Sequence, residues 1–361
     1  MRKLSRALAL VFAGTLVGFP WVDLVAQSGP VPYKLGMFRQ ADRTYVGLVV
    51  NDAVVVDLSQ AGIKAPATLR ELIADWNPTI AGQLARLAAD AARQQPGGSQ
   101  IRLNQVKTLP PIPDPMTMLA AAVNYQEHAI EMRSGSTAVA SAAAVDPKVA
   151  LGLPGYWNRK PGDLRQNPFM FPKLRAAITG EGDPIILPPG RAQVDWECEL
   201  AVVVGKTAQG ISADRAADYI FGYTLMNDVS DRGGRADGRH GSDWLLGKSH
   251  DTFAPMGPFV VPRQFVPDPQ KLGIRFTLSG KVMQDSNTSR MTHNVFEVFE
   301  YASHIITLQP GDILSTGSPA GVGTARETPI YMKAGDTSVC TIDRIGTLTN
   351  PVQAQRPRAT R

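Results

Sequence analysis

Alternating apolar and polar residues predict a small antiparallel meander early in the chain. The stretch "YKLGMFRQADRTYVGLVVNDAVVVDLS", residues 33–59, is broken at Ala41-Asp42 and Asn51-Asp52, and such breaks between apolar runs are typical of hairpin turns. Two segments with helical spacing follow, "TLRELIAD" and "IAGQLARLAADAAR". The proline-rich link "LPPIPDP", residues 109–115, predicts a domain boundary, so we expect a small amino-terminal β-rich domain at 27–108.

Residues 109–350 have the pattern of a strand-rich domain, in which short apolar runs are separated by Gly and Pro turns. Helices are expected around His128, in "ADRAADYI" and in "NVFEVFEYASHII". The predicted fold class is therefore α+β and mainly β. Residues 351–361 are predicted to form a basic tail.

A long segment at 132–170 lacks clear periodicity. A stretch of this length without regular structure is typical of a lid, a binding loop or disorder. We expect a lid, whose aromatic pair Tyr156-Trp157 would dock at the mouth of the site. The alternative is an ordered surface insertion that serves an oligomer contact.

The first 26 residues predict a signal peptide. They combine a basic start, an apolar run from Ala7 to Phe19 and a possible cleavage position after Ala26. A membrane anchor is the alternative, but the run is shorter than the ~20 residues that a spanning helix needs. We therefore expect an exported, periplasmic protein without stable membrane insertion after processing, and a cytoplasmic one if the segment is not processed.

Composition adds little to this picture, because 43% hydrophobic and 19% charged residues are typical of a globular protein. The formal net charge of +5 lies mainly in residues 1–26 and 351–361, so the folded body is close to neutral and no nucleic-acid partner is expected. Cys198 and Cys340 are interpreted as buried free thiols.

Candidate chemistry begins with "VDWECELAVVVG", an apolar, strand-like stretch that contains Glu197 and Glu199. Side chains two apart on a strand share a face, about 7 Å apart, and burying two unpaired carboxylates costs several kcal/mol each. A hard divalent cation such as Mg²⁺, Mn²⁺ or Ca²⁺ would neutralise them, and Asp228 in "GYTLMNDVSDRG" offers a third carboxylate. The alternative is an edge strand whose glutamates face solvent.

A possible general base lies in "VNYQEHAIE", where His128 and Glu131 are three residues apart and hence neighbours on one helical face. A carboxylate beside an imidazole raises its basicity and fixes its tautomer. The alternative is an ordinary His/Glu pair on a helix surface. Lys248 in "LLGKSHDTFAPMGP" and the turn with Thr316 and Ser318 are ambiguous by themselves, and that turn lacks the spacing of a phosphate-binding loop.

Six blocks, taken in order across roughly 110–325, resemble the fumarylacetoacetate hydrolase family. They are "VNYQEHAIE", "FPKLRAAITGEGDPIILP", "DWECELAVVVGK", "GYTLMNDVSDR", "GKSHDTFAPMGPFVV" and "GDILSTGSPAGVG". The resemblance implies a mixed β-roll core and a divalent metal, with Mg²⁺ the first choice, held by Glu197, Glu199 and Asp228. It also implies a His128–Glu131 acid/base dyad and a homodimer.

The resemblance further implies roles for other residues. Lys248 would be catalytic, and the substrate-binding residues would be Tyr125, Lys173, Arg232, Thr316 and Ser318. From the basic loop "DRGGRADGRHGSD", one of Arg232, Arg235 or Arg239 is expected to neutralise a substrate carboxylate.

The favoured function is metal-dependent hydrolysis of a C–C bond in a small 2-oxo or 1,3-dicarbonyl acid, such as a fumarylacetoacetate- or acylpyruvate-like compound of aromatic catabolism. A second possibility is an isomerase, hydratase or decarboxylase on a related acid, since one metal site can stabilise an enolate for all of them. A third is an exported metal-dependent binding protein without turnover, although a binder does not need a positioned base.

Overall fold

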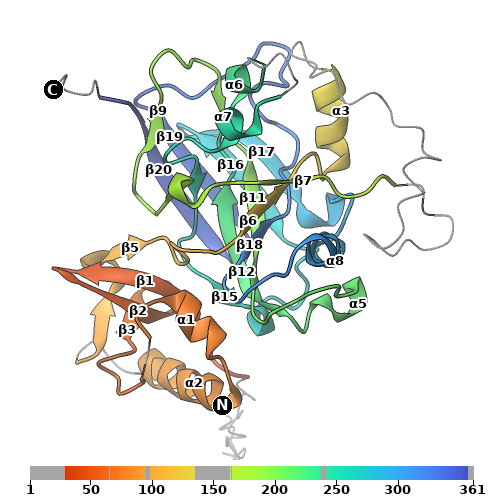
Figure 1. Cartoon of the computed structure of the whole chain (residues 1–361). Coiled ribbons are helices and arrows are strands. Elements are labelled where there is room, and N and C mark those ends of the chain that lie inside the picture. Colours follow the sequence, from red (N-terminus) through yellow and green to blue (C-terminus); the bar gives the residue numbers. More distant parts are fainter. Residues whose placement is uncertain are drawn as a thin grey trace, which may run out of the picture. The chain divides into compact units, whose positions relative to one another are not determined.

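The meander expected near the start forms a five-stranded antiparallel sheet in the order β4-β3-β2-β1-β5 (Figure 1). Its turns fall where the sequence breaks, and Ala41, Asn51 and Asp52 all adopt positive φ. Helices α1 and α2 follow β3, as their spacing predicted. The bounds are β1 (Lys34–Gln40), β2 (Arg43–Val50), β3 (Val54–Asp57), α1 (Leu69–Ala74), α2 (Pro78–Arg93), β4 (Gln100–Arg102) and β5 (Lys107–Leu109).

The structure is a computed structural model that describes residues 29–64, 66–93, 98–134, 163, 165–236 and 242–356. The predicted signal segment and most of the 132–170 segment, including Tyr156 and Trp157, lie outside these residues, so both interpretations stay predictions. Within the described part of the chain, no helix combines the length and apolar character needed to cross a bilayer.

The central sheet of the larger region has the order β15-β12-β11-β18-β6-β7 and carries the residues of interest. Strands β11 and β12 are buried along their whole length, which explains their nearly continuous apolar sequence. Only β18 and β6 pair in parallel, and the other pairs are antiparallel. The bounds are β6 (Met118–Ala121), β7 (Met170–Pro172), β11 (Cys198–Val204), β12 (Ile220–Asn227), β15 (Val261–Pro262) and β18 (Ile313–Ser315).

A third sheet, in the order β17-β16-β19-β20-β9, lies beside the central one (Figure 1). Its strands are β9 (Ile185–Leu187), β16 (Gly273–Leu278), β17 (Lys281–Asn287), β19 (Thr337–Ile342) and β20 (Gly346–Ala354). Trp196 stacks on Phe276 of β16 with ring centroids 5.3 Å apart, so the two sheets share one core. Two short pairs complete the strands: β8 (Ile178–Thr179) with β14 (Ala254–Pro255), and β10 (Val194–Asp195) with β13 (Ser230–Asp231).

The helices of this region are short, and the three expected from the sequence are among them. Asn294 begins α8 with a capping box, because its side chain accepts from the backbone N–H of Glu297 while the Glu297 side chain accepts from that of Asn294. The bounds are α3 (Gln126–Ser134), α5 (Ala213–Ala216), α6 (Arg232–Ala236), α7 (Trp244–Lys248) and α8 (Val295–Ile305), with 3₁₀ turns η1 (Leu103–Gln105), η2 (Arg175–Ala177), η3 (Arg263–Phe265) and η4 (Thr288–Arg290).

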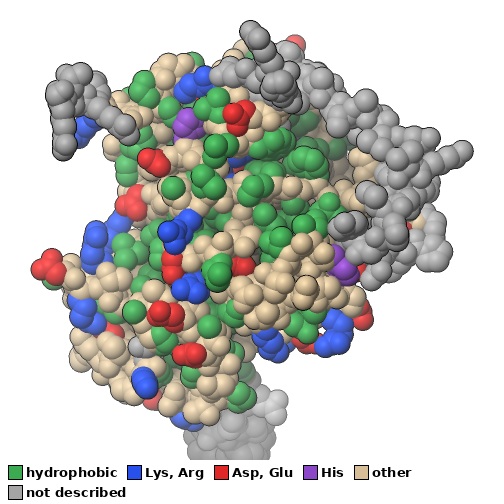
Figure 2. Space-filling model, in the orientation of Figure 1, with side chains coloured by type: hydrophobic (Ala, Val, Ile, Leu, Met, Phe, Trp, Pro, Cys, Tyr) green, Lys and Arg blue, Asp and Glu red, His purple; other side chains and the backbone are tan. Residues whose placement is uncertain are grey.

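The predicted fold class, α+β and mainly β, is confirmed. The expected start of the basic tail at 351 is wrong, because β20 runs to Ala354 and pairs with β9, and Val352 is buried there. On the face drawn in Figure 2, the described acidic and basic side chains are interspersed.

The interpretation of the cysteines as free thiols is wrong. Cys198 of β11 and Cys340 of β19 form a disulfide, with their Cα atoms 5.6 Å apart. The two residues are separated by 142 positions, and no local pattern could show that their strands face each other.

A buried polar cluster fixes the entry to α3. Asn124 donates to the carbonyls of His293 and Thr316 and accepts from the backbone N–H of His293. Next to it, Arg165 forms ion pairs with Asp163 and Glu297, the latter in the first turn of α8. The cluster therefore joins residues on both sides of the 135–162 segment to α8.

His293 in this cluster makes folding dependent on pH. Burial, together with the positive charge of Arg165, lowers the pKa of His293 from 6.5 to about 4, so the folded protein takes up this proton at lower pH than the unfolded chain. The contribution of His293 to the free energy of unfolding is complete above about pH 6.5. It is lost as the pH is lowered towards 4 and amounts to roughly 2–3 kcal/mol.

We expect His293→Gln, which cannot be protonated, to flatten this part of the pH dependence. The free energy of unfolding, measured in urea at pH 7 and pH 4.5, should fall less for the variant than for the parent protein. Carboxylates that do not interact with His293 titrate in both proteins, so an identical fall in both would refute the assignment to His293.

Candidate metal centre and acid/base dyad

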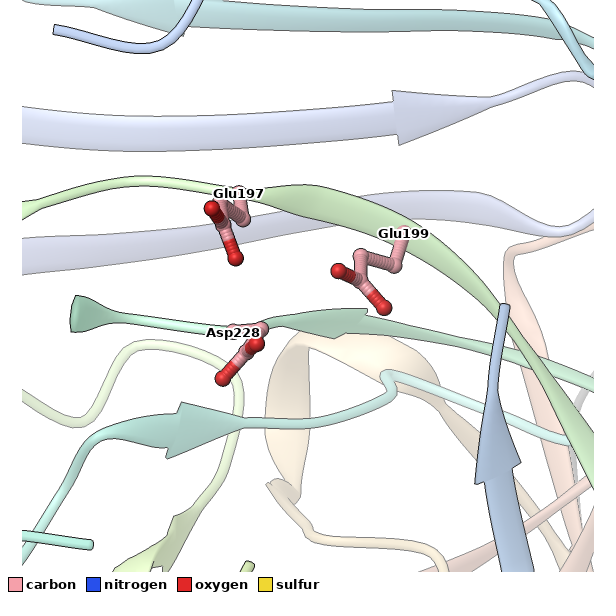
Figure 3. A group of neighbouring side chains, drawn as sticks. All are labelled: Glu197, Glu199 and Asp228. Carbon is pink, nitrogen blue, oxygen red and sulfur yellow. The ribbon is translucent and has the colours of Figure 1, made fainter. Parts of the chain in front are cut away.

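Glu197, Glu199 and Asp228 converge from two neighbouring strands (Figure 3). Glu197 directly precedes β11, Glu199 lies within it, and Asp228 directly follows β12. The backbone N–H of Asp228 donates to the carbonyl of Glu197, which brings the end of one strand to the start of the other. Each side chain offers an oxygen within 4.8 Å of the other two, and all three are buried. The sequence prediction of these three residues as neighbours therefore agrees with the geometry.

Three cations surround the carboxylates. The Nζ atom of Lys248 lies 2.6 Å from Oε2 of Glu197 and also binds Asp228, while Lys173 binds the other oxygen of Asp228. Arg232 donates to Oε1 of Glu197 at 2.7 Å. Burial alone would raise the pKa of Glu197, but its cationic neighbours, Lys248 foremost, hold that pKa well below its usual range.

Glu199 has a different environment. Its Oε2 atom accepts from the Ser315 hydroxyl and from the backbone N–H of Gly317 at 2.9 Å. Burial, followed by the negative charges of Asp228 and Glu197, raises the pKa of Glu199 well above its usual range. Negative charge is therefore incompletely balanced on this side of the group, which fits a divalent cation.

The phenol of Tyr125 supports the same fit. Tyr125 is fully buried, its hydroxyl has no hydrogen-bond partner among the described residues, and burial together with the charge of Glu199 raises its pKa. Buried hydroxyls usually have a hydrogen-bond partner, and a water or ligand oxygen beside Glu199 would supply one for Tyr125. Oxygen donors in this number suit Mg²⁺, Mn²⁺ or Ca²⁺, which keep open positions for water or substrate.

The dyad predicted on α3 is formed and faces the carboxylates. The Nδ1 atom of His128 lies 2.7 Å from Oε1 of Glu131, and its Nε2 lies 3.8 Å from Oε1 of Glu197. The second oxygen of Glu131 accepts from the backbone N–H of Gly321 at 2.8 Å. Because Glu131 fixes one ring nitrogen, the other is directed to the site.

Comparison with known proteins agrees with this geometry. The sequence model described as "Fumarylacetoacetate (FAA) hydrolase C-terminal" matches residues 117–353. The chain belongs to the fumarylacetoacetate hydrolase family.

Relatives in this family are similar over nearly the whole chain. The mitochondrial oxaloacetate tautomerase fahd2 of Xenopus laevis is 33% identical over 91% of this chain and 92% of its own length. Oxaloacetate tautomerase YisK of Bacillus subtilis is 34% identical over 86% of this chain and 97% of its own. Maleylpyruvate hydrolase from Sphingobium sp. SYK-6, solved with manganese(II) and pyruvate, is 28% identical with a TM-score of 0.65 and covers 90% of this chain and 100% of its own.

The other residues expected to bind substrate are engaged in the fold. The Thr316 hydroxyl donates to the carbonyl of Leu200, and the Ser318 hydroxyl contacts the Gln284 amide. Lys173 and Arg232 bind carboxylates of the centre, as described above. The side chain of Arg235 and all of Arg239 lie outside the described residues. A role for any of them in binding substrate therefore stays a prediction.

Sequence reasoning missed Asp195, although the residue lies in the quoted stretch. Its carboxylate accepts from Nε of Arg232 and from the backbone N–H groups of Gly323 and Thr324. Gly323 is required there, because a Cβ atom would lie 1.8 Å from the carbonyl oxygen of Ile330. Asp195 thus positions both Arg232 and the loop whose Gly321 supports the dyad. Ser315 was missed too, because its hydrogen bond to Glu199 depends on the pairing of β18 with β11 and not on a local motif.

Replacing Glu199 tests the metal centre. We expect Glu199→Ala to weaken Mn²⁺ binding, measured by calorimetry, by more than the roughly 10–100-fold that is typical for residues behind the ligands. The fold should persist, since the substitution removes a buried carboxylate beside two others. Glu327→Ala, at an exposed position, is the matched control. Unchanged Mn²⁺ affinity in Glu199→Ala would exclude this residue as a ligand.

Proposed function

We propose that the protein is a metal-dependent enzyme that shifts a proton at the carbon next to the carbonyl of a small 2-oxo acid, as an oxaloacetate tautomerase does. The observation that carries the proposal is the dyad beside the carboxylates, with Nε2 of His128 3.8 Å from Glu197. Mg²⁺ is the expected metal, with Mn²⁺ or Ca²⁺ as alternatives, and Glu197, Glu199 and Asp228 would hold it.

A divalent cation at this centre would act as a Lewis acid towards the 2-oxo group and make the adjacent C–H more acidic. His128 accepts that proton at Nε2 and returns it to the other position, while Glu131 stabilises the imidazolium through Nδ1–H. Lys248 is fully buried beside Glu197 and Asp228, so its ammonium is suited to balance negative charge that develops on the substrate.

Two considerations favour proton transfer over C–C hydrolysis, the reaction first expected from the sequence. Proton transfer needs one positioned base and no attacking water. In addition, the relatives named as oxaloacetate tautomerases are 33% and 34% identical to the chain, whereas maleylpyruvate hydrolase is 28% identical.

Hydrolysis of a larger acid is the second candidate, and one feature favours it. The centroid of the Phe171 ring lies 5.0 Å from Nζ of Lys248. The Trp244 ring packs at a tilt against Phe171, with centroids 4.6 Å apart, and against Phe169, with centroids 5.7 Å apart. Phe169 is exposed, so aromatic side chains lead from the centre to the surface. Oxaloacetate has no group for such a surface, whereas an acylpyruvate with an apolar substituent does.

Substrate assays distinguish these candidates. Protein loaded with Mg²⁺ or Mn²⁺ should accelerate the exchange between the enol and keto forms of oxaloacetate, followed by ultraviolet absorbance, and leave its carbon skeleton intact in NMR spectra. Pyruvate released from acylpyruvates would support the hydrolase instead. Tight binding of these acids with no product from any of them would favour the binding protein.

His128→Ala tests the base. We expect the variant to lower kcat by roughly 10²–10⁴-fold, the usual contribution of a general base, and to keep its Mn²⁺ affinity. His304→Ala on α8 is the control, because the Nδ1 atom of that imidazole lies 2.9 Å from the Glu300 carbonyl of its own helix. If His128→Ala raises KM but keeps kcat, the residue binds substrate and is not the base.

Homodimer formation, export and closure of a lid over the site stay predictions from the sequence.

A further inference from the structure

The disulfide joins the metal centre to the third sheet. Cys198 lies between Glu197 and Glu199, and its partner Cys340 lies on β19, opposite Phe276 of the neighbouring strand. The backbone N–H of Cys198 donates to the Gln284 side chain of β17 at 3.1 Å. The start of β11 is therefore attached to the third sheet at Cys198, between the two proposed metal ligands Glu197 and Glu199.

Both cysteines are inaccessible in the folded protein, with exposures of 0% for Cys198 and 1% for Cys340. The stacked rings of Trp196 and Phe276 lie in the same core. A buried pair cannot meet an oxidant after folding is complete, so the bond must form while the chain folds. The redox state of the compartment in which the chain folds then decides whether the bond exists.

We propose that oxidation of Cys198 and Cys340 completes the metal centre, and that the chain reaches its full metal affinity only when it folds in an oxidising compartment. This inference rests on the metal-dependent function proposed above. In the step, the two thiols lose two protons and two electrons to a protein disulfide donor, which becomes a dithiol, and one S–S bond forms.

Packing explains how the bond would act on the ligands. Two sulfur atoms that are not bonded need a wider separation than the ~2.05 Å of a disulfide. A closely packed core has no spare room, so reduction must displace β11 or β19. Because Glu197 and Glu199 flank Cys198, a displacement of β11 moves both carboxylates relative to Asp228 on the neighbouring strand.

The sequence supplies an independent reason to expect oxidation. Residues 1–26 have the layout of a signal peptide, and disulfides persist in the exported compartments to which such segments direct a chain. A basic start with an apolar run and a buried cysteine pair are unrelated features, and each points to folding outside the cytoplasm.

The experiment compares the protein purified after export with the same protein unfolded and refolded in a phosphine reductant. Thiols are counted under denaturing conditions with a chromogenic disulfide, and Mn²⁺ affinity is measured by electron paramagnetic resonance. Exported protein should show no free thiol, and both of its cysteines should react after reduction. The reduced form should bind Mn²⁺ roughly 10–100-fold more weakly, the range typical for groups that orient ligands.

Matched variants separate the bond from general damage. Cys198→Ala/Cys340→Ala should bind Mn²⁺ more weakly than the oxidised protein and show no response to the reductant. Thr341→Ala alters the neighbouring residue of β19, whose hydroxyl contacts Thr347 near the surface, and should respond to the reductant like the parent protein.

Three results would overturn the inference. Free thiols in folded, exported protein would show that the bond does not form. Equal Mn²⁺ affinity of the oxidised and reduced forms would show that the bond does not act on the centre, while the proposed function survives. No Mn²⁺ binding in either form would overturn the proposed function together with this inference.

Discussion

Three carboxylates buried within 4.8 Å of one another are the constraint on which the rest of the site depends. Such a group is unstable without positive charge, because each buried ion loses its hydration. The chain supplies Lys248, Lys173 and Arg232 from three separate segments, all contacting Glu197 or Asp228. Among the described residues, Glu199 receives hydrogen bonds from Ser315 and Gly317, and it is the carboxylate whose pKa is raised.

The sheets explain how distant segments meet at this point. Glu199 lies in β11, Glu197 directly precedes that strand, and Asp228 directly follows β12. Strand β18 ends at Ser315 beside Glu199, and α7 ends at Lys248. The His128–Glu131 pair is tied to the same framework, because Glu131 contacts Gly321 in the loop that Asp195 holds. A displacement of Asp195 would therefore affect both Arg232 and the loop that contacts Glu131.

Local patterns predicted part of this arrangement. Residues two apart on a strand share a face, and this rule predicted that Glu197 and Glu199 point to the same side. Residues three apart on a helix are neighbours, and this rule predicted that His128 lies beside Glu131. The resemblance in the order of the blocks predicted the family and the fold class correctly. The assignment of roles to these residues stays a prediction until it is measured.

Other features depend on contacts between segments far apart in the sequence, which no local period encodes. The Cys198–Cys340 bond and the contact of Ser315 with Glu199 are of this kind. The partners of the Thr316 and Ser318 hydroxyls could not be predicted from the motif either. The two residues lie in one glycine-rich turn, yet Thr316 contacts Leu200 and Ser318 contacts Gln284. The tail boundary was misplaced because the pairing of β20 with β9 carries the strand past residue 351.

The most direct measurement is the anomalous diffraction of a crystal soaked in Mn²⁺. A single strong peak is expected about 2.1–2.2 Å from one oxygen each of Glu197, Glu199 and Asp228, the coordination distance for a small divalent cation with oxygen ligands. No peak at saturating Mn²⁺, with Lys248 still bridging Glu197 and Asp228, would show that the lysine and not a metal neutralises this centre.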